Sequence, residues 1–415
     1  MTHRLESDLR AAFSATYGFS PAVVARAPGR VNLIGEHTDY SDLPVLPMAI
    51  EQSLFVAATP SDDGVVEVRS MDFPGAATIS RDDPRAIEAW QRYIVGALGQ
   101  IADVAPGKGA KLLVASSLPS TGGLSSSSAL TMGTLAALLA AWGEPFDVAA
   151  IARRAIVAER HVGVESGGMD QTVIAFGKAG NALRIDFRPP SRELVRLPEG
   201  VSFVVASSGE DAPKGGSARD AYNERVVGAR IAAAMIADQV GVDLDLPLTL
   251  AQVSTVDVVD IIVDGLPEKV APQEVAHGTE VQLQHFVQLT TASFDHMAKV
   301  PVKRVARHIL SEASRVDEAQ VALEQGDLRR FGKLLDESHN SLREDMRCST
   351  AALDRVCAAM RRAGALGARL TGAGFGGFAL AACDPASVAA VVEAAIAATG
   401  GPAFEVRASD GLELL

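Results

Sequence analysis

The sequence predicts an α+β protein of two domains, in which helices pack on mixed sheets. The chain has 415 residues, which is long enough for two domains. Strand-like runs such as 111–116 occur together with apolar runs such as 130–142, which is typical of a buried helix. The proline pair Pro189-Pro190 predicts a linker and divides the chain into domains 1–190 and 191–415.

The composition is that of a globular protein with a large core. Hydrophobic residues make up 48% of the chain and charged residues 21%, but aromatic residues only 5%. Alanine, valine and leucine must therefore supply most of the core. The net charge of −13 argues against non-specific binding to nucleic acid or to an anionic membrane. An anionic substrate would need local positive charge or a metal ion.

Cysteine usage predicts a reduced, cytoplasmic setting. The chain has three cysteines: Cys348, Cys357 and Cys383. Their number is odd and they form no CxxC spacing, so neither a disulfide framework nor a zinc site is expected. The charged stretch 1–17 predicts an amphipathic surface helix rather than a signal peptide. The apolar run 130–142 is too short to span a bilayer.

The first half of the chain begins with the predicted strand 23–27, followed by a loop over 28–40. This loop concentrates functional groups: Arg30, Asn32, Glu36, His37, Thr38 and Asp39. Paired acceptors and donors on a fixed backbone suit the hydroxyls of a sugar. A solvated polar turn and a metal cluster are the alternatives, but no second cluster of matching ligands supports a transition metal.

Further elements follow in order. Residues 43–59 predict strands of a mixed sheet. A hairpin with its turn at Asp62-Asp63-Gly64 is expected to join the last of these strands to a strand at 65–68. A helix is expected to begin near Trp90, and the strand 111–116 leads into the next motif.

The serine-rich stretch 118–130 predicts a tight turn that opens a buried helix. Gly122 and Gly123 allow the backbone to approach a ligand closely because no Cβ intrudes. The serines fall in the first helical turn, where free N–H groups and the helix dipole favour an anion. A serine-capped core helix is the plainer alternative, although four serines in a row exceed what capping requires.

A second polar motif follows the helix predicted from Asp147 to Arg160, which carries Glu159 near its end. Asp170 comes two residues after the pair Gly167-Gly168, where the backbone can hold its carboxylate close to a bound hydroxyl. The alternative is an N-cap for a helix beginning at Gln171. Both roles can coexist.

The strand predicted at 182–187 closes the first domain. The second domain then contains a buried strand at 201–206 and a polar loop at 207–219. A helix then begins near Tyr222, and residues 226–340 are mostly helical by pattern. The isolated histidines are expected to be surface or core residues rather than ligands: His277, His285, His296 and His308.

A glycine motif over 367–378 contains G-x-G-x-x-G at Gly372, Gly374 and Gly377. The dinucleotide fingerprint requires a helix after the glycines, whereas residues 378–382 predict a strand. A dinucleotide fold is therefore rejected. The chain contains no G-x-x-x-x-G-K-[ST], so it is no Walker-type nucleotide-binding protein either.

Together these motifs resemble those of a known family. Residues 29–40 resemble the sugar-binding signature of galactokinases, and the serine stretch resembles the phosphate-binding motif of the wider superfamily of galactokinase, homoserine kinase, mevalonate kinase and phosphomevalonate kinase (GHMP kinases). Residues 90–96 are similar to the family's Trp-x-x-Tyr-Val-x-Gly, and 367–378 resemble its third motif. The resemblance covers nearly the whole chain. It implies an N-terminal mixed sheet with helices, similar to ribosomal protein S5, and a ferredoxin-like C-terminal domain, with the active site in the cleft between them.

The resemblance implies ATP-dependent phosphorylation of galactose at its anomeric hydroxyl, giving galactose 1-phosphate and ADP. Asp170 and Arg30 are the implied catalytic residues, and Ser127 and Glu159 the implied Mg²⁺ ligands. The implied sugar contacts are Glu36, His37, Thr38, Asp39, Gly167 and Tyr222. The implied nucleotide contacts are Thr121, Gly122, Gly123, Leu124, Ser125, Ser126, Ser127, Gly372 and Gly374.

The chain also departs from the family pattern. The family continues Asn-Gly-Gly-Phe-Val after Tyr40, where this chain has Ser-Asp-Leu-Pro-Val at 41–45, next to the sugar signature. One residue is missing between Glu159 and Val162, and residues 266–301 predict a helical insertion. A kinase of another monosaccharide, such as an N-acetylhexosamine or arabinose, and a non-catalytic sugar- and ATP-binding regulator therefore stay open. No nucleic-acid or membrane partner is indicated, and the oligomeric state is open, with a monomer among the possibilities.

Overall fold

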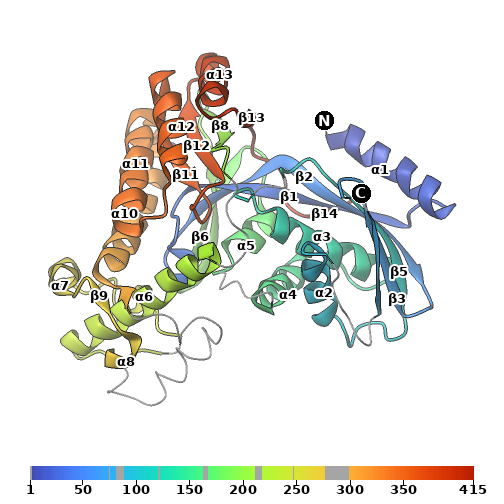
Figure 1. Cartoon of the computed structure of the whole chain (residues 1–415), viewed down its shortest axis with the longest axis horizontal. Helices are drawn as coiled ribbons and strands as arrows, with labels where there is room; N and C mark the ends of the chain where they lie inside the picture. The colour runs from blue at the N-terminus through green and yellow to red at the C-terminus, as the bar shows by residue number, and fades with distance from the viewer. Residues whose placement is uncertain are drawn as a thin grey trace.

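The computed structural model describes residues 2–73, 75–80, 88–119, 122–161, 167–210, 217–245, 247–275 and 299–415. Two groups of elements stand side by side, each built on its own sheet (Figure 1). Several predicted features lie outside the described residues: Thr121, His277, His285, His296 and most of the helical insertion expected at 266–301. In the described part of the chain, no helix combines the length and the apolarity that a membrane span requires.

The first sheet has six strands in the order β14-β1-β2-β5-β3-β4. All neighbours are antiparallel except β3 and β5, which are parallel, so the predicted mixed sheet is confirmed. The strands are β1 (Val23–Ile34), β2 (Leu46–Ser61), β3 (Val65–Ser70), β4 (Ala76–Ser80), β5 (Gly109–Ser116) and β14 (Glu413–Leu414).

The hairpin predicted through residues 62–64 is wrong. The chain does turn there, but β5 lies between β2 and β3 in the sheet, so these consecutive strands are not neighbours. A turn signal fixes where a strand ends but not which strand pairs with it, because the pairing is a long-range choice.

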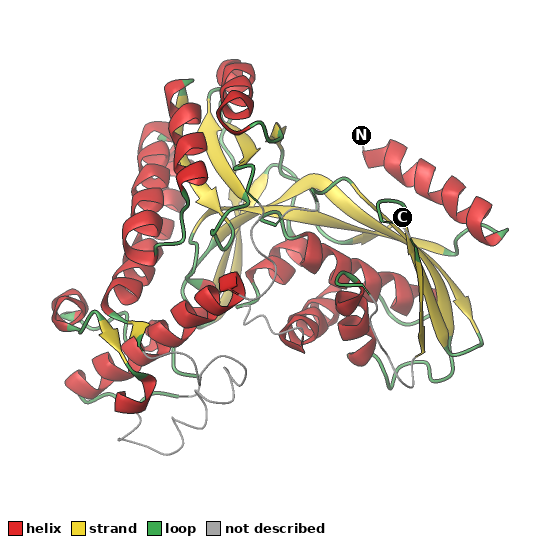
Figure 2. Cartoon of the chain, viewed as in Figure 1, coloured by secondary structure: helices red, strands yellow, loops and turns green. Residues whose placement is uncertain are grey.

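Helices cover both faces of the first sheet (Figures 1 and 2). The N-terminal helix α1 (Thr2–Tyr17) packs Leu9 and Phe13 against side chains such as Phe55, on the opposite face from the main core, and confirms the predicted surface helix. The other face is covered by α2 (Gln91–Gly99), α3 (Ser126–Ala141), α4 (Val148–His161) and α5 (Met169–Phe176). Helix α3 is buried nearly all round, as its continuous apolar run predicts.

A separate hairpin corrects the predicted linker. Strands β6 (Asn181–Phe187) and β7 (Pro190–Arg196) pair antiparallel, and Pro189 lies in the turn that joins them. Proline suits such a turn because its φ is fixed and it needs no hydrogen-bond partner. The chain therefore enters the second sheet after β7 rather than at the proline pair.

The second sheet is antiparallel, in the order β11-β12-β8-β13. Its strands are β8 (Ser202–Ser207), β11 (Ala365–Thr371), β12 (Phe378–Cys383) and β13 (Ala403–Val406). The larger helices of this half are α6 (Ser217–Val240), α10 (Lys303–Gln325), α11 (Leu328–Ser341), α12 (Ala351–Arg362) and α13 (Val388–Thr399). Smaller elements are α7 (Val259–Gly265), β9 (Lys269–Val270), α8 (Pro272–Val275) and β10 (Val300–Pro301). The architecture agrees with the predicted α+β class.

The two halves are tied together by the end of the chain. Strand β14 pairs with β1, and Arg26 on β1 forms an ion pair with Glu413 at 2.8 Å. Residues of the second half therefore complete the first sheet. The division into 1–190 and 191–415 stays a prediction.

Candidate active site

The site begins on strand β1, which continues through the region predicted as a loop. The register of β1 against β2 shifts between Pro28 and Gly29, and Gly29 to Asn32 then pair with β2 again. Gly29 has no room for a side chain, because a Cβ there would lie 2.3 Å from Leu118 Cδ2. The Pro-Gly pair thus marks a β-bulge within a strand. Arg30 is consequently placed on a rigid, buried strand.

Asp170 lies in the first turn of α5, which begins at Met169. Gly168 is the N-cap residue, with φ of +101°, so the alternative of Asp170 as the N-cap is wrong. A carboxylate in the first turn is stabilised by the helix dipole. Its side chain points toward β1 and meets Arg30.

Arg30 and Asp170 form a two-point ion pair. Arg30 Nε donates to Asp170 Oδ1 at 2.8 Å and Arg30 Nη2 donates to Oδ2 at 2.9 Å. Arg30 Nη1 donates to the carbonyl of Gly123 at 2.6 Å, and Ser125 Oγ donates to Asp170 Oδ2 at 2.5 Å. Such paired geometry fixes both groups in orientation as well as in distance. Arg30 is buried, whereas the Asp170 side chain keeps 21% exposure, so the carboxylate is accessible to a ligand.

The serine-rich segment meets this pair at the start of α3. Ser125 adopts a left-handed conformation (φ +58°) and makes no side-chain cap, because its hydroxyl donates to Asp170. The first N–H groups of α3 are therefore not capped by that side chain, which leaves them available to an anion. Helix α3 begins at Ser126, as the serine motif predicts.

The glycine motif of the second half lies directly against the serine-rich segment. A Cβ at Gly372 would lie 3.2 Å from Gly123 Cα, and one at Gly123 would lie 3.3 Å from Phe378. Gly374 is tightly packed too, since a Cβ there would lie 2.4 Å from the Cys348 carbonyl oxygen. The strand after the motif, β12, confirms that this is no dinucleotide fingerprint. The backbones of the two motifs are brought together although they lie about 250 positions apart in the sequence.

The polar residues after β1 form a compact turn, defined here as the sugar turn (residues 35–40). His37 Nδ1 lies 3.1 Å from Tyr40 Oη, and Nε2 lies 3.1 Å from the Ala373 carbonyl. The carbonyl only accepts, so Nε2 carries the proton. Burial lowers the pKa of His37 to about 3, which keeps the ring neutral at pH 7. Tyr222 on α6 packs near both rings, with centroid distances of 5.5 Å to His37 and 5.6 Å to Tyr40.

Glu36 is anchored by the second half of the chain. Its Oε1 accepts from Gly372 N at 2.7 Å and lies 3.3 Å from Arg369 Nη2. Arg369 on β11 is fully buried, and its Nη1 also donates to the carbonyl of Leu33 at 2.9 Å. Burial raises the pKa of Glu36, and the charges of Arg369 and Arg30 oppose that rise.

Asp39 is the acidic group placed closest to Gly167. A Cβ at Gly167 would lie 2.4 Å from the Asp39 carbonyl carbon and 2.6 Å from its Cγ, so only glycine fits. Burial raises the pKa of Asp39 to about 7, and the charges of Asp170 and Glu36 raise it in the same direction. The charges of Asp170 and Glu36 thus act on Asp39 within one site.

The hydroxyl of Thr38 is hydrogen-bonded inside the sugar turn, and its role as a sugar contact stays a prediction. Thr38 Oγ1 lies 2.9 Å from the Gly35 carbonyl and 2.8 Å from the Pro44 carbonyl, and the residue is fully buried. Its proton is therefore taken by backbone acceptors that close the turn.

Glu159, on α4, lies next to Ser128 at the start of α3 and next to Gln171 on α5. Glu159 Oε1, Ser128 Oγ and the side-chain amide of Gln171 make no hydrogen bond of normal geometry with any described residue, and all three residues are buried. The side chains of Ser128 and Gln171 nevertheless lie close enough to Glu159 to lower its pKa. Burial and the Asp170 charge raise the pKa of Glu159 to about 7. Burial raises the pKa of Tyr93, and the charge of Glu159 raises it further. A hydrogen bond from Ser127 acts in the opposite direction.

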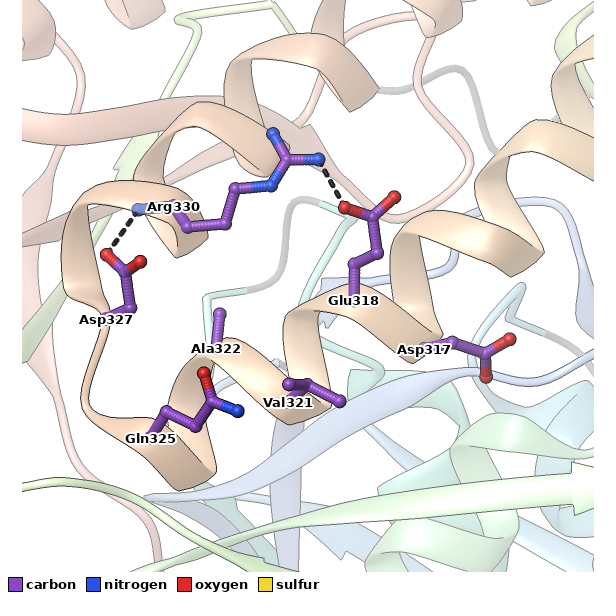
Figure 3. Close-up of a pocket in the computed structure, with 7 residues that line it drawn as sticks. All are labelled: Asp317, Glu318, Val321, Ala322, Gln325, Asp327 and Arg330. Carbon is purple, nitrogen blue, oxygen red and sulfur yellow. Dashed lines mark hydrogen bonds and ion pairs between the residues drawn. The ribbon is translucent and has the colours of Figure 1, made fainter.

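Sequence reasoning missed several residues around the site. The run of four serines points to Ser128, and Gln171 directly follows Asp170, but no local pattern marks Arg369, His308 or Glu312. His308 is buried with its Nε2 3.0 Å from the Glu36 carbonyl, in keeping with the expected core histidine. The surface pocket in Figure 3 lies elsewhere, at the corner between α10 and α11, and is lined by Asp317, Glu318, Val321, Ala322, Gln325, Asp327 and Arg330.

Comparison with known proteins agrees with this arrangement. Residues 11–60 match the galactokinase galactose-binding signature, and residues 92–178 and 319–400 match the N-terminal and C-terminal domains of GHMP kinases. A galactokinase of Chloroflexus aggregans is 36% identical over 403 residues, covering 94% of this chain and 91% of the relative. The chain belongs to the galactokinase family.

Other members of the family match over the same length. A galactokinase of Streptomyces coelicolor is 34% identical over 423 residues and 97% of each chain. The crystal structure of Lactococcus lactis galactokinase complexed with galactose is 28% identical, with a TM-score of 0.79 over 98% of this chain and 99% of that one. A mevalonate kinase of Methanococcus jannaschii, 17% identical with a TM-score of 0.61, shares the fold. These matches confirm the predicted family and its two-domain α+β fold.

Proposed function

We propose that this member of the galactokinase family transfers the γ-phosphoryl group of ATP to the anomeric hydroxyl of galactose, giving galactose 1-phosphate and ADP. The observation that carries the proposal is the two-point Arg30–Asp170 pair at the start of the serine helix, with the sugar turn on its other side. The galactose-binding signature covers both β1 and the sugar turn.

In the proposed reaction, the oxygen of the sugar hydroxyl bonds to the γ-phosphorus while the bond from that phosphorus to the β–γ bridging oxygen breaks. Asp170 receives or orients the hydroxyl proton. Arg30 offsets the negative charge of the transferred group while it holds Asp170 in place. Most of the rate in phosphoryl transfer comes from positioning and electrostatics, so a strong base is not required.

The sugar is recognised by Glu36, His37, Asp39, Gly167 and Tyr222 in this proposal. The carboxylates of Glu36 and Asp39 provide acceptors of the kind that neighbouring sugar hydroxyls require. His37, whose ring nitrogens bind Tyr40 and the Ala373 carbonyl, is proposed to contact the sugar through its ring surface or backbone. The absence of a side chain at Gly167 leaves room for Asp39 next to it. Tyr222 closes the group from α6.

The nucleotide is proposed to bind at the serine-rich segment and the glycine motif. Its phosphates lie against the N-terminus of α3, whose dipole favours negative charge, near Gly122 to Ser127. Gly372 and Gly374 keep the second half close enough to complete this surface. Thr121 is part of the proposal by its place in the motif. The overall charge of −13 makes these local features necessary for binding ATP.

Mg²⁺ fits the side chains behind α3. Glu159 has a buried carboxylate oxygen that makes no hydrogen bond of normal geometry with any described residue, and Ser128 and Gln171 offer further oxygens of the same kind beside it. Within the described ranges, no three His, Cys, Asp or Glu side chains gather around a common point. That suits Mg²⁺, which takes oxygen ligands, needs only one or two carboxylates and completes its shell with phosphate and water. Glu159 and Ser127 are the proposed ligands, and the ion would neutralise charge on the phosphates.

The proposal extends to the setting of the enzyme. The cleft between domains 1–190 and 191–415 is the proposed active site, because residues of the second half complete the site at Glu36 and Gly123. Three free, buried cysteines support a reduced, cytoplasmic location.

A coupled ADP-release screen over a panel of monosaccharides tests the function. Turnover with galactose, absent without ATP or with Asp170→Asn, is the expected result. Turnover with another monosaccharide instead of galactose would reassign the substrate, which the altered segment at 41–45 makes worth testing. Tight binding of sugar and ATP without turnover would overturn the enzyme proposal in favour of a regulator.

A further inference from the structure

One face of helix α10 lies against the backbone of the sugar turn. His308, Glu312 and Val316 are spaced by four residues and so share that face. Gly35 has φ of +100°, and a Cβ there would lie 2.9 Å from Val316 Cγ2 and 2.9 Å from Val45 Cα. The helix therefore touches the turn directly, without room for a side chain between them.

Two side chains on this face of α10 bind the turn, one through a backbone carbonyl and the other through backbone amides. His308 Nε2 lies 3.0 Å from the Glu36 carbonyl oxygen, which only accepts, so the ring donates there. Glu312 Oε1 accepts from Gly35 N at 3.0 Å and from Glu36 N at 3.4 Å. The backbone at Glu36 is thus fixed through its carbonyl and its amide at once.

Glu312 is itself held in one orientation. Its side chain is fully buried, with Oε1 accepting from Ser338 Oγ at 2.6 Å and Oε2 accepting from Arg315 Nε at 2.7 Å. The charge of Arg315 helps to keep the pKa of Glu312 at about 2, despite its burial. His308 is likewise buried, with Nδ1 2.9 Å from Ser341 Oγ. A fixed charge and a fixed ring therefore contact Gly35 and Glu36, which lie in neither a helix nor a strand.

We propose that His308 and Glu312 are positioning residues for sugar recognition, holding residues 35–37 in the register at which Glu36, His37 and Asp39 face the sugar. The inference rests on the proposed function, because it assigns the sugar to that turn. None of the hydrogen bonds that His308 and Glu312 make within the described part of the chain reaches helix α3. We therefore expect their loss to act more strongly on the sugar than on ATP.

The histidine offers a matched pair of variants. The amide nitrogen of glutamine reaches the position of Nε2, so His308→Gln retains a donor to the Glu36 carbonyl. The amide nitrogen of asparagine reaches only the position of Nδ1, so His308→Asn loses that donor. We expect His308→Asn to raise the KM and the Kd for galactose about tenfold, equivalent to about 1.4 kcal/mol. His308→Gln stays within about threefold, and the KM for ATP changes less than about twofold in both variants.

Glu312→Gln is an independent test, because it keeps the size and shape of the side chain but removes the negative charge that binds Arg315 and the amides of Gly35 and Glu36. We expect a higher galactose KM with an unchanged ATP KM, while Glu324→Gln, on an exposed part of the same helix, changes neither. Binding of galactose without ATP, measured by calorimetry, and thermal unfolding accompany the kinetics of each variant.

The outcomes separate this inference from the proposed function. A wild-type protein that phosphorylates no galactose overturns the proposed function itself. An active wild type whose His308→Asn variant keeps its galactose KM overturns the positioning role alone. Equal effects of His308→Gln and His308→Asn, or equal rises in both KM values, would show a general loss of packing and also overturn it. If His308→Asn does not fold, the Glu312→Gln and Glu324→Gln pair decides.

Discussion

The two sides of the site are built in different ways. On the phosphate side, Arg30 lies on β1, Asp170 on α5 and Ser125 directly before α3, and their side chains hydrogen-bond one another. On the sugar side, the turn at 35–40 is held mainly through its backbone, and the groups that hold it belong to α10 and the glycine motif of the second half. The Glu36 side chain adds a hydrogen bond with Gly372 N in the same half.

The comparison separates chemistry from recognition. The proposed reacting groups belong to one strand and the starts of two helices in the first half, so their geometry depends little on how the two halves are arranged. The sugar turn depends on contacts across the whole chain, because its anchors are more than 270 positions away in sequence. Changes on the first side should reduce kcat, and changes on the second should raise the galactose KM.

The largest effect is expected at Asp170. Asp170→Asn keeps the size of the side chain but removes the charge that Arg30 binds and the acceptor for the hydroxyl proton. Phosphorylation of galactose should fall by at least about 10³-fold, as expected when a proton acceptor and an electrostatic contact are lost together. Arg30→Ala should abolish phosphorylation as well. ADP release measures both, with circular dichroism as the check on folding, and near-wild-type turnover of either folded variant would refute the roles.

The sugar side is tested most strongly at Gly167. A Cβ there must displace Asp39, which lies within 2.6 Å of the position it would take. We expect Gly167→Ala to lower kcat/KM for galactose about 10²-fold, the cost typical of moving a binding group by about 1 Å. Gly99→Ala is the matched control, because a Cβ at Gly99 meets no atom within 4 Å among the described residues. If both variants keep wild-type kcat/KM, Asp39 does not bind the sugar.

The buried Asp39 predicts a dependence of stability on pH. Its pKa is about 7 in the folded protein and about 3.9 when unfolded, so the folded state binds more protons between those values. Its contribution to the free energy of unfolding therefore falls as pH rises from 4 to 7. Asp39→Asn should gain about 2 kcal/mol relative to wild type between pH 5 and pH 7.5.

Urea unfolding of both proteins at the two pH values measures this gain. The buried His37 and His308, with pKa values lowered to about 3 and about 4, act in the opposite direction but are common to both proteins. A difference between the proteins that does not change with pH would mean that Asp39 is ionised throughout.

The smallest effect is expected far from the site. Glu318 and Arg330 form a partly exposed ion pair at the pocket of Figure 3. Glu318→Gln should cost about 1 kcal/mol or less and leave the KM values for galactose and ATP unchanged. Thermal unfolding and steady-state kinetics check this, and a clear rise in either KM would show that this pocket belongs to the functional surface.

The same division explains what the sequence could predict. Arg30, Asp170 and the serines lie in short local motifs that predict chemistry, and Arg30, Asp170 and Ser125 do meet in the structure. The prediction of a loop beginning at Pro28 was wrong, because a bulge in a strand has the same local residues as a loop. The position of β5 between β2 and β3 was missed because strand order is decided by distant pairing.

The anchors of the sugar side were the least predictable. His308 and Glu312 are an isolated histidine and an ordinary glutamate on a long helix, with nothing around them in sequence to suggest a ligand site. Thr38, in contrast, stands within the sugar signature, yet its hydroxyl serves the backbone. A motif locates a site, but long-range packing decides which of its side chains face the ligand.

Identification of the product of the wild-type enzyme tests the central claim most directly. With ATP, Mg²⁺ and galactose, nuclear magnetic resonance should show a phosphate bonded to the anomeric carbon of galactose, formed together with ADP and absent with Asp170→Asn. A phosphate on any other carbon, or the same product at the same rate from Asp170→Asn, would contradict the account.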